Sequence, residues 1–196
     1  MPVERSYRTR SVVLCHYPSR NDVLRRAEDL RATFLDESLD DQWYEARWIV
    51  SAAATFHYVE DAVASECYVS VSGDVPTVVE GTLRMVMEDL DVWSPDELVA
   101  AVDDANDPVG RGSALIRLVI GSPIHYDAEI AERVYDGLDD PDHRVREMAI
   151  WASSYRAFPQ YRSRLRELAE RDPEGSVRDS AREMLEFYDQ AGVAES

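Results

Sequence analysis

The residues of this chain that could perform chemistry are few and widely spaced. Its cysteines and histidines are scattered, at Cys15, His16, His57, Cys67, His125 and His143. Only Cys15 and His16 are neighbours, and a metal site built on them would need ligands from distant segments. The same pair would act as nucleophile and base only if a third group on a rigid element oriented it. We therefore predict no metal site, no cofactor and no catalytic residue.

The absence of lysine excludes several enzyme classes directly. All 21 basic residues are arginine, whereas a P-loop, a protein-kinase site, a pyridoxal-phosphate Schiff base and an S-x-x-K acyl-enzyme site all need a lysine. Neither G-x-S-x-G nor H-E-x-x-H occurs. Gly110-Arg111-Gly112 matches only the start of a dinucleotide fingerprint, and no strand precedes it. These observations favour a non-enzymatic protein.

Negative charge dominates the surface chemistry. The net charge is −18, and residues 60–107 contain 13 acidic residues against the single Arg84, a local net of −12. One interpretation is a solvated face of a folded protein. The other is an acidic ridge that attracts a protein with a basic surface and speeds its association.

Composition indicates a folded protein of the cytoplasm. A chain of 196 residues, 45% hydrophobic and 31% charged, is long enough to bury a core as one domain. No apolar run approaches the ~20 residues of a membrane span, and the stretch from Val12 to Cys15 is too short for a signal-peptide core. Two cysteines without an export signal are expected to stay reduced.

The elements that position the side chains are indicated by a repeat. Residues 140–149 (DPDHRVREMA) recur at 172–181 (DPEGSVRDSA). An Asp-Pro turn suits a helix start, because Asp accepts from free N–H groups and Pro lacks an N–H that would have no partner there. Apolar residues then follow at helical spacing. Arg146 and Arg178 are expected to tie neighbouring turns together.

This D-P-x-x-x-V-R-x-x-A pattern resembles the opening of a HEAT-like repeat, of the short phycobilisome-lyase type. The resemblance implies an all-α fold, a right-handed α-solenoid of about four to five antiparallel helical hairpins with an N-terminal capping helix. Aspartates at a spacing of 33, 33, 33 and 32 residues extend the register backwards, at Asp41, Asp74, Asp107, Asp140 and Asp172.

The predicted organisation is one domain. Residues 1–36 form an arm and a capping helix, with an apolar stripe that ends near Leu35. Residues 37–192 form the repeat array and 193–196 a tail. Within the array we expect helices over about 41–56 and 59–68, with an extended loop after them. From Pro76 onward, a capping box at Ser94 and the turns at Asp107, Asp140 and Asp172 mark three hairpins and a last helix.

The resemblance also implies a binding function, since the second helices of such hairpins line a concave face. We expect an adaptor, scaffold or immunity-type inhibitor that binds a protein with a basic surface. We expect it not to bind a membrane. The expected partner-binding residues are Trp93, Asp96, Asp103, Tyr126, Glu129, Arg133, Arg162 and Arg166. The alternative is a nucleic-acid-binding or DNA-repair protein that uses the C-terminal arginines.

Overall fold

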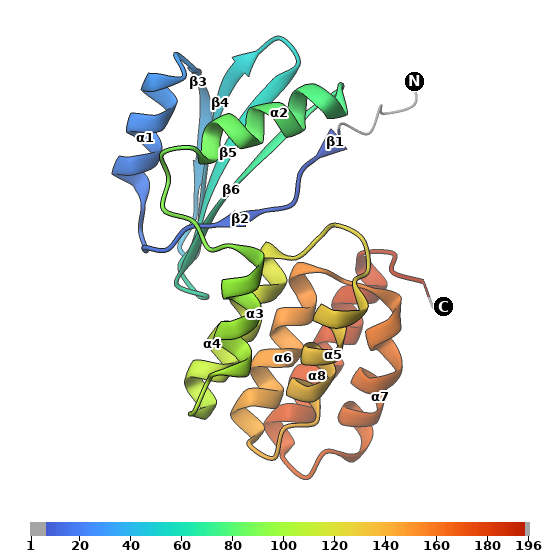
Figure 1. Cartoon of the computed structure of the whole chain (residues 1–196). Coiled ribbons are helices and arrows are strands. Elements are labelled where there is room, and N and C mark those ends of the chain that lie inside the picture. Colours follow the sequence, from blue (N-terminus) through green and yellow to red (C-terminus); the bar gives the residue numbers. More distant parts are fainter. Residues whose placement is uncertain (1–6, 195–196) are drawn as a thin grey trace. The chain divides into compact units, whose positions relative to one another are not determined.

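The computed structural model describes residues 7–194 and divides into two compact units, one ending at Trp93 and the other beginning at Ser94. The first contains a sheet and two helices, and the second is helical (Figure 1).

An antiparallel six-stranded sheet organises the first unit. The strands are β1 (Tyr7–Arg8), β2 (Val12–Val13), β3 (Thr33–Leu39), β4 (Trp43–Ser51), β5 (Ala54–Asp61) and β6 (Glu66–Gly73). Their order is β1-β6-β5-β4-β3, and β2 also pairs with β6. The four long strands follow one another as hairpins, because short turns after Leu39, Ser51 and Asp61 return the chain beside itself.

Helices α1 (Arg20–Asp29) and α2 (Pro76–Met87) lie on the same face of this sheet (Figure 1). That face presents Tyr44, Ala46 and Trp48 from β4, which alternate with half-buried neighbours. Buried Arg26 joins the two helices: its guanidinium donates to the carbonyl oxygens of Met85 and Val86 at the end of α2. A guanidinium thus satisfies carbonyls that a helix end leaves free.

The prediction of an all-α fold is wrong. Residues 43–51, 54–61 and 66–73, predicted as two helices and a loop, form the three central strands. The stripe Trp43, Ala46, Val50, Ala54 has helical spacing, but Tyr44, Ala46 and Trp48 alternate in a stretch rich in aromatic and β-branched residues, which suit a half-buried strand. Asp41 lies in the β3–β4 turn and Asp74 just before α2, so neither starts a helical repeat.

The second unit consists of helices joined by short turns. They are α3 (Pro95–Asp103), α4 (Pro108–Gly121), α5 (Ala128–Leu138), α6 (His143–Tyr155), the short η1 (Pro159–Tyr161), α7 (Arg162–Arg171) and α8 (Gly175–Gln190). Helix α6 packs between α4 and α8. The predicted capping box is present: the Ser94 hydroxyl accepts from the Glu97 amide and the Glu97 carboxylate accepts from the Ser94 amide.

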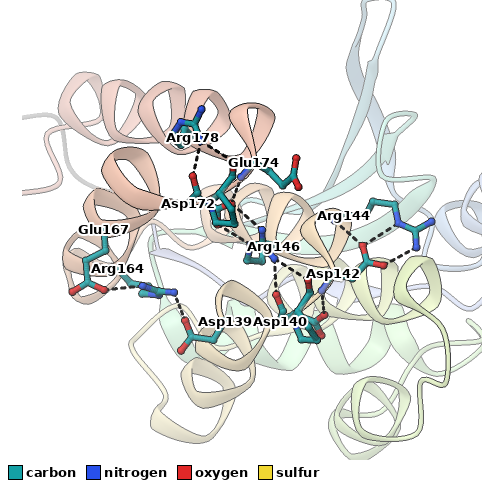
Figure 2. A network of polar contacts seen from close by, with 12 residues as sticks. Asp139, Asp140, Asp142, Arg144, Arg146, Arg164, Glu167, Asp172, Glu174 and Arg178 are labelled. Atoms are coloured by element: carbon teal, nitrogen blue, oxygen red, sulfur yellow. Dashed lines mark hydrogen bonds and ion pairs between the residues drawn. The ribbon is translucent and has the colours of Figure 1, made fainter.

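The Asp107-Pro108 turn starts α4 as predicted, because the Asp107 carboxylate accepts from the Gly110 amide at 2.9 Å. The turns at Asp140 and Asp172 work differently (Figure 2). Asp142, not Asp140, caps α6 by accepting from the Arg144 amide at 2.9 Å. Buried Asp140 accepts from the Asp142 amide and from Arg111 of the preceding helix α4, each at 2.8 Å. The Asp140 carboxylate therefore folds its own turn and also binds a side chain from an earlier helix.

Arg146 makes the corresponding contact one turn later. Its Nε and Nη2 donate to Asp172, both at 2.8 Å, and its Nη1 donates to the carbonyl oxygens of Asp140 and Pro141 (Figure 2). Arg178 donates to the carbonyls of Asp172 and Pro173. The prediction that Arg146 ties neighbouring turns is confirmed, whereas the same prediction for Arg178 is wrong, because Arg178 bonds the carbonyls of its own turn. The assignment of the whole chain to a HEAT-like α-solenoid is nevertheless wrong, because the first unit is built on a sheet.

Candidate functional site

Strand β3 forms one edge of the sheet and carries exposed apolar side chains. It pairs with β4 on one side, and no other strand among residues 7–194 pairs with its outer side. Phe34, Leu35 and Leu39 are 53%, 45% and 76% exposed. An edge strand offers unpaired N–H and C=O groups, and proteins usually blunt such edges or cover them. A seven-residue open edge with three exposed apolar side chains is therefore a candidate surface for strand addition.

Local interactions fix where β3 begins and ends. Arg31 adopts a left-handed backbone conformation (φ 54°) after α1, and the Ala32 amide donates to the Ala27 carbonyl, which turns the chain back onto the sheet. At the other end, the Asp40 carboxylate accepts from the amides of Gln42 and Trp43 at 2.8 and 2.7 Å. The strand is thus held at both termini while its outer edge stays open.

A bulge interrupts the pairing of β3. The register shifts between Phe34 and Asp36, so Leu35 has no partner residue on β4. Phe34 packs its ring edge-on against Trp48, with centroids 6.0 Å apart. Bulges bend an edge and limit indiscriminate pairing, so the bulge restricts which strands could pair with this edge.

Carboxylates surround this edge. Residues 32–41 contain four of them and no arginine. Asp36 accepts two hydrogen bonds from Arg47 of β4, at 2.6 and 2.5 Å, and these lower the pKa of Asp36. Glu37 accepts from the Tyr44 hydroxyl at 2.8 Å; burial together with this bond raises the pKa of Tyr44 to about 12. Glu37 and Asp41 are exposed, so the edge presents negative charge.

Three of the residues predicted to bind a partner meet in the second unit. Arg133 of α5 donates to both carboxylate oxygens of Asp103 at the end of α3, at 2.9 and 2.7 Å, and lies 3.5 Å from Glu129. The hydrogen bond from Arg133 lowers the pKa of Asp103. This cluster ties α5 to α3. Asp96 lies exposed in the first turn of α3.

The other predicted residues are dispersed. Trp93 ends the first unit, where its amide donates to the Val13 carbonyl. The Tyr126 ring packs edge-on against Phe158 at 5.5 Å. Arg162 is buried and ion-paired with Asp189, and Arg166 lies on α7. The acidic segment 60–107 runs through both units, from β5 to the turn before α4.

Sequence reasoning missed the apolar edge because it placed Phe34 and Leu35 at the end of a helix. The stripe Val23, Ala27, Leu30, Phe34 continues the helical period past the residue where α1 ends. The signal that marks the strand is Thr33-Phe34-Leu35, a short run of residues with β propensity.

The described residues contain no group of three or more His, Cys, Asp or Glu side chains placed to hold a metal ion. Across residues 7–194, every helix is too short or too polar to span a membrane. Comparison with protein-family models, with curated proteins and with solved structures finds no significant match.

Proposed function

We propose that this chain is a protein-interaction module that binds an extended segment of a basic partner by adding it as a strand along β3. The observation that carries the proposal is the open, seven-residue edge with three exposed apolar side chains. Main-chain hydrogen bonds along such an edge supply affinity, and alternate side chains of the added strand supply specificity.

The negative charge of the β3 edge indicates whether the added strand comes from a second copy of this chain or from a different protein. A second copy would bring the same four carboxylates of residues 32–41 against one another, and like charges directly opposite on paired strands are destabilising. A segment with arginine or lysine between apolar residues would instead meet Glu37 and Asp41 with opposite charge and cover Leu35 and Leu39. Complementary charge also speeds association and makes it sensitive to salt.

The test is affinity capture from an extract of the native host, with three baits in parallel. The first is the wild-type chain, and the second carries Leu35→Arg and Leu39→Arg, which remove apolar area and reverse the local charge. The third is Val109→Arg, a matched control on α4 of the second unit, where Val109 is 55% exposed. The proposal requires a basic protein captured by the wild type and the control, lost with the double variant, and released by raised salt.

Backbone amide hydrogen exchange then locates the contact. In the complex, exchange of the amides of residues 33–39 is expected to slow relative to the free chain, because an added strand protects edge N–H groups. Capture that the double variant retains, or protection confined to the second unit, contradicts strand addition at β3. The nucleic-acid alternative is less well supported, since Arg162 and Arg164 are both ion-paired with carboxylates.

A further inference from the structure

A line of three hydrogen-bonded side chains lies on the sheet face opposite α1 and α2. The His57 ring is within 2.7 Å of the Ser72 hydroxyl through Nε2 and within 2.9 Å of the Glu45 carboxylate through Nδ1. The three residues come from β6, β5 and β4. This is the order hydroxyl, imidazole, carboxylate that activates a serine.

The strand register places these residues on one face. His57 lies opposite Arg47 on β4 and opposite Ser70 on β6, so Glu45 and Ser72 are its diagonal neighbours, two residues along each partner strand. Residues two apart on a strand share a face. The imidazole therefore bridges its two partners across three strands of a rigid sheet, and no loop is involved in its placement.

The hydrogen bonds define the state of the imidazole. An ionised carboxylate can only accept, so Nδ1 carries the proton and donates to Glu45, and Nε2 is left to accept from the Ser72 hydroxyl. Burial lowers the pKa of His57, the Glu45 hydrogen bond opposes this change, and the charges of Arg8 and Arg47 reinforce it. Only 6% of His57 is exposed, whereas Ser72 is partly exposed. At neutral pH the ring is a neutral base beside the hydroxyl of a partly exposed serine.

We propose that Ser72 is the nucleophile of an acyl-transfer site that cleaves carboxylic esters, with His57 as general base and Glu45 as a positioning residue. The Ser72 oxygen bonds to the ester carbonyl carbon while its proton passes to His57 Nε2. The C–O bond to the alcohol breaks, and the alcohol leaves with that proton. Water then attacks the acyl-serine, gives a proton to His57, and releases the carboxylic acid as the Ser72 hydroxyl is restored.

A fluorophosphonate probe, which phosphonylates activated serines, tests the nucleophile in the full-length chain. Intact-mass and peptide mass spectrometry should find one adduct, on Ser72, and hydrolysis of p-nitrophenyl acetate should accompany it. Removal of the base by His57→Gln should slow labelling by about 10²- to 10⁴-fold, the usual contribution of a positioned general base. Ser72→Ala should abolish both signals.

Ser70→Ala is the matched control, because Ser70 lies two residues away on the same face and bonds Arg8 but not His57. It should keep the labelling rate of the wild type. Glu45→Gln should move the acidic limb of the labelling profile to lower pH, because Glu45 raises the pKa of His57. The other charged groups around this face are Arg8 on β1, Arg47 on β4 and Asp36 on β3, and they stay unchanged.

A network that only stabilises the sheet gives a different pattern. Ser72→Ala and His57→Gln would then lower the melting temperature while wild-type protein showed no adduct and no esterase activity above the Ser72→Ala background. That result, or an adduct on another residue, overturns the proposal. A negative result in the affinity-capture test of the β3 edge would not affect the Ser72 proposal, because the two sites use different residues.

Discussion

Replacing Arg146 by methionine tests whether the buried contact between α6 and the turn before α8 stabilises the second unit. The side chains of Arg146 and Asp172 are only 9% and 3% exposed. Methionine fills much of the volume but leaves the Asp172 carboxylate buried without its guanidinium, and the Asp140 and Pro141 carbonyls without a donor. Removing one partner of a buried ion pair costs about 3–5 kcal/mol, a large share of the stability of a typical domain.

The assay is urea unfolding of the full chain, followed by far-UV circular dichroism, with the free energy of unfolding obtained by linear extrapolation. Arg144→Met is the matched control: Arg144 lies two residues away on α6 and bonds Asp142, but its side chain is 53% exposed. An exposed pair is expected to contribute far less than a buried one. Equal losses of stability in the two variants would refute the argument from burial.

The pH dependence of the free energy of unfolding is a second test of the contact between Arg146 and Asp172. Burial, the largest single effect, opposes ionisation of Asp172, but the hydrogen bonds from Arg146 and the Glu174 amide, together with the charges of Arg146 and Arg164, outweigh it, and the net pKa of Asp172 is lowered. A carboxyl whose pKa is lower folded than unfolded stabilises the fold above its unfolded pKa of about 3.9, and this contribution disappears as pH falls through the folded pKa. Arg146→Met should flatten the loss of stability below about pH 4. An unchanged acid limb would contradict the assignment.

Three further predictions concern separate sites. Because burial lowers the pKa of His57, wild-type stability should decline as pH falls below about 6.5, and His57→Gln should remove that slope in thermal unfolding. Ser94→Ala should cost about 1 kcal/mol of stability in urea unfolding, since it deletes the cap of α3. Gly112→Ala should cost about 1–3 kcal/mol by overpacking, because its Cβ would lie 2.9 Å from the Met148 Cβ; a melting temperature equal to wild type would show that Met148 moves aside freely.

The helices of the second unit were predictable because their signals are local. The capping box at Ser94, the Asp-Pro turns and the apolar spacing after them each act within about one or two helical turns. The role of Arg146 was predictable from the repeat of the Asp-Pro turn, although its contact with Asp172 spans 26 residues.

The sheet was not predictable from the spacing of apolar residues along the sequence. The apolar residues of segment 43–54 fit both a helical and an alternating pattern. Only the pairing of this segment with β3 and β5 decides that it forms a strand. Both candidate sites depend on that pairing. The β3 edge exists because no strand within residues 7–194 follows β3 in the strand order. The line of Glu45, His57 and Ser72 exists because of the register across three strands. Non-local register leaves no mark in a single sequence window.

The carboxylates of Asp140 and Asp172, which each accept hydrogen bonds from two partners, also affect how the helical second unit unfolds. Each one binds an amide of its own turn and a guanidinium from an earlier helix, so the last helix cannot detach without breaking the fold of the turn before it. Local unfolding that begins at the C-terminus should therefore not extend past α8 into the turn before it. The amides of α4, α6 and α8 are expected to exchange with deuterium in one concerted opening, as a single cooperative unit.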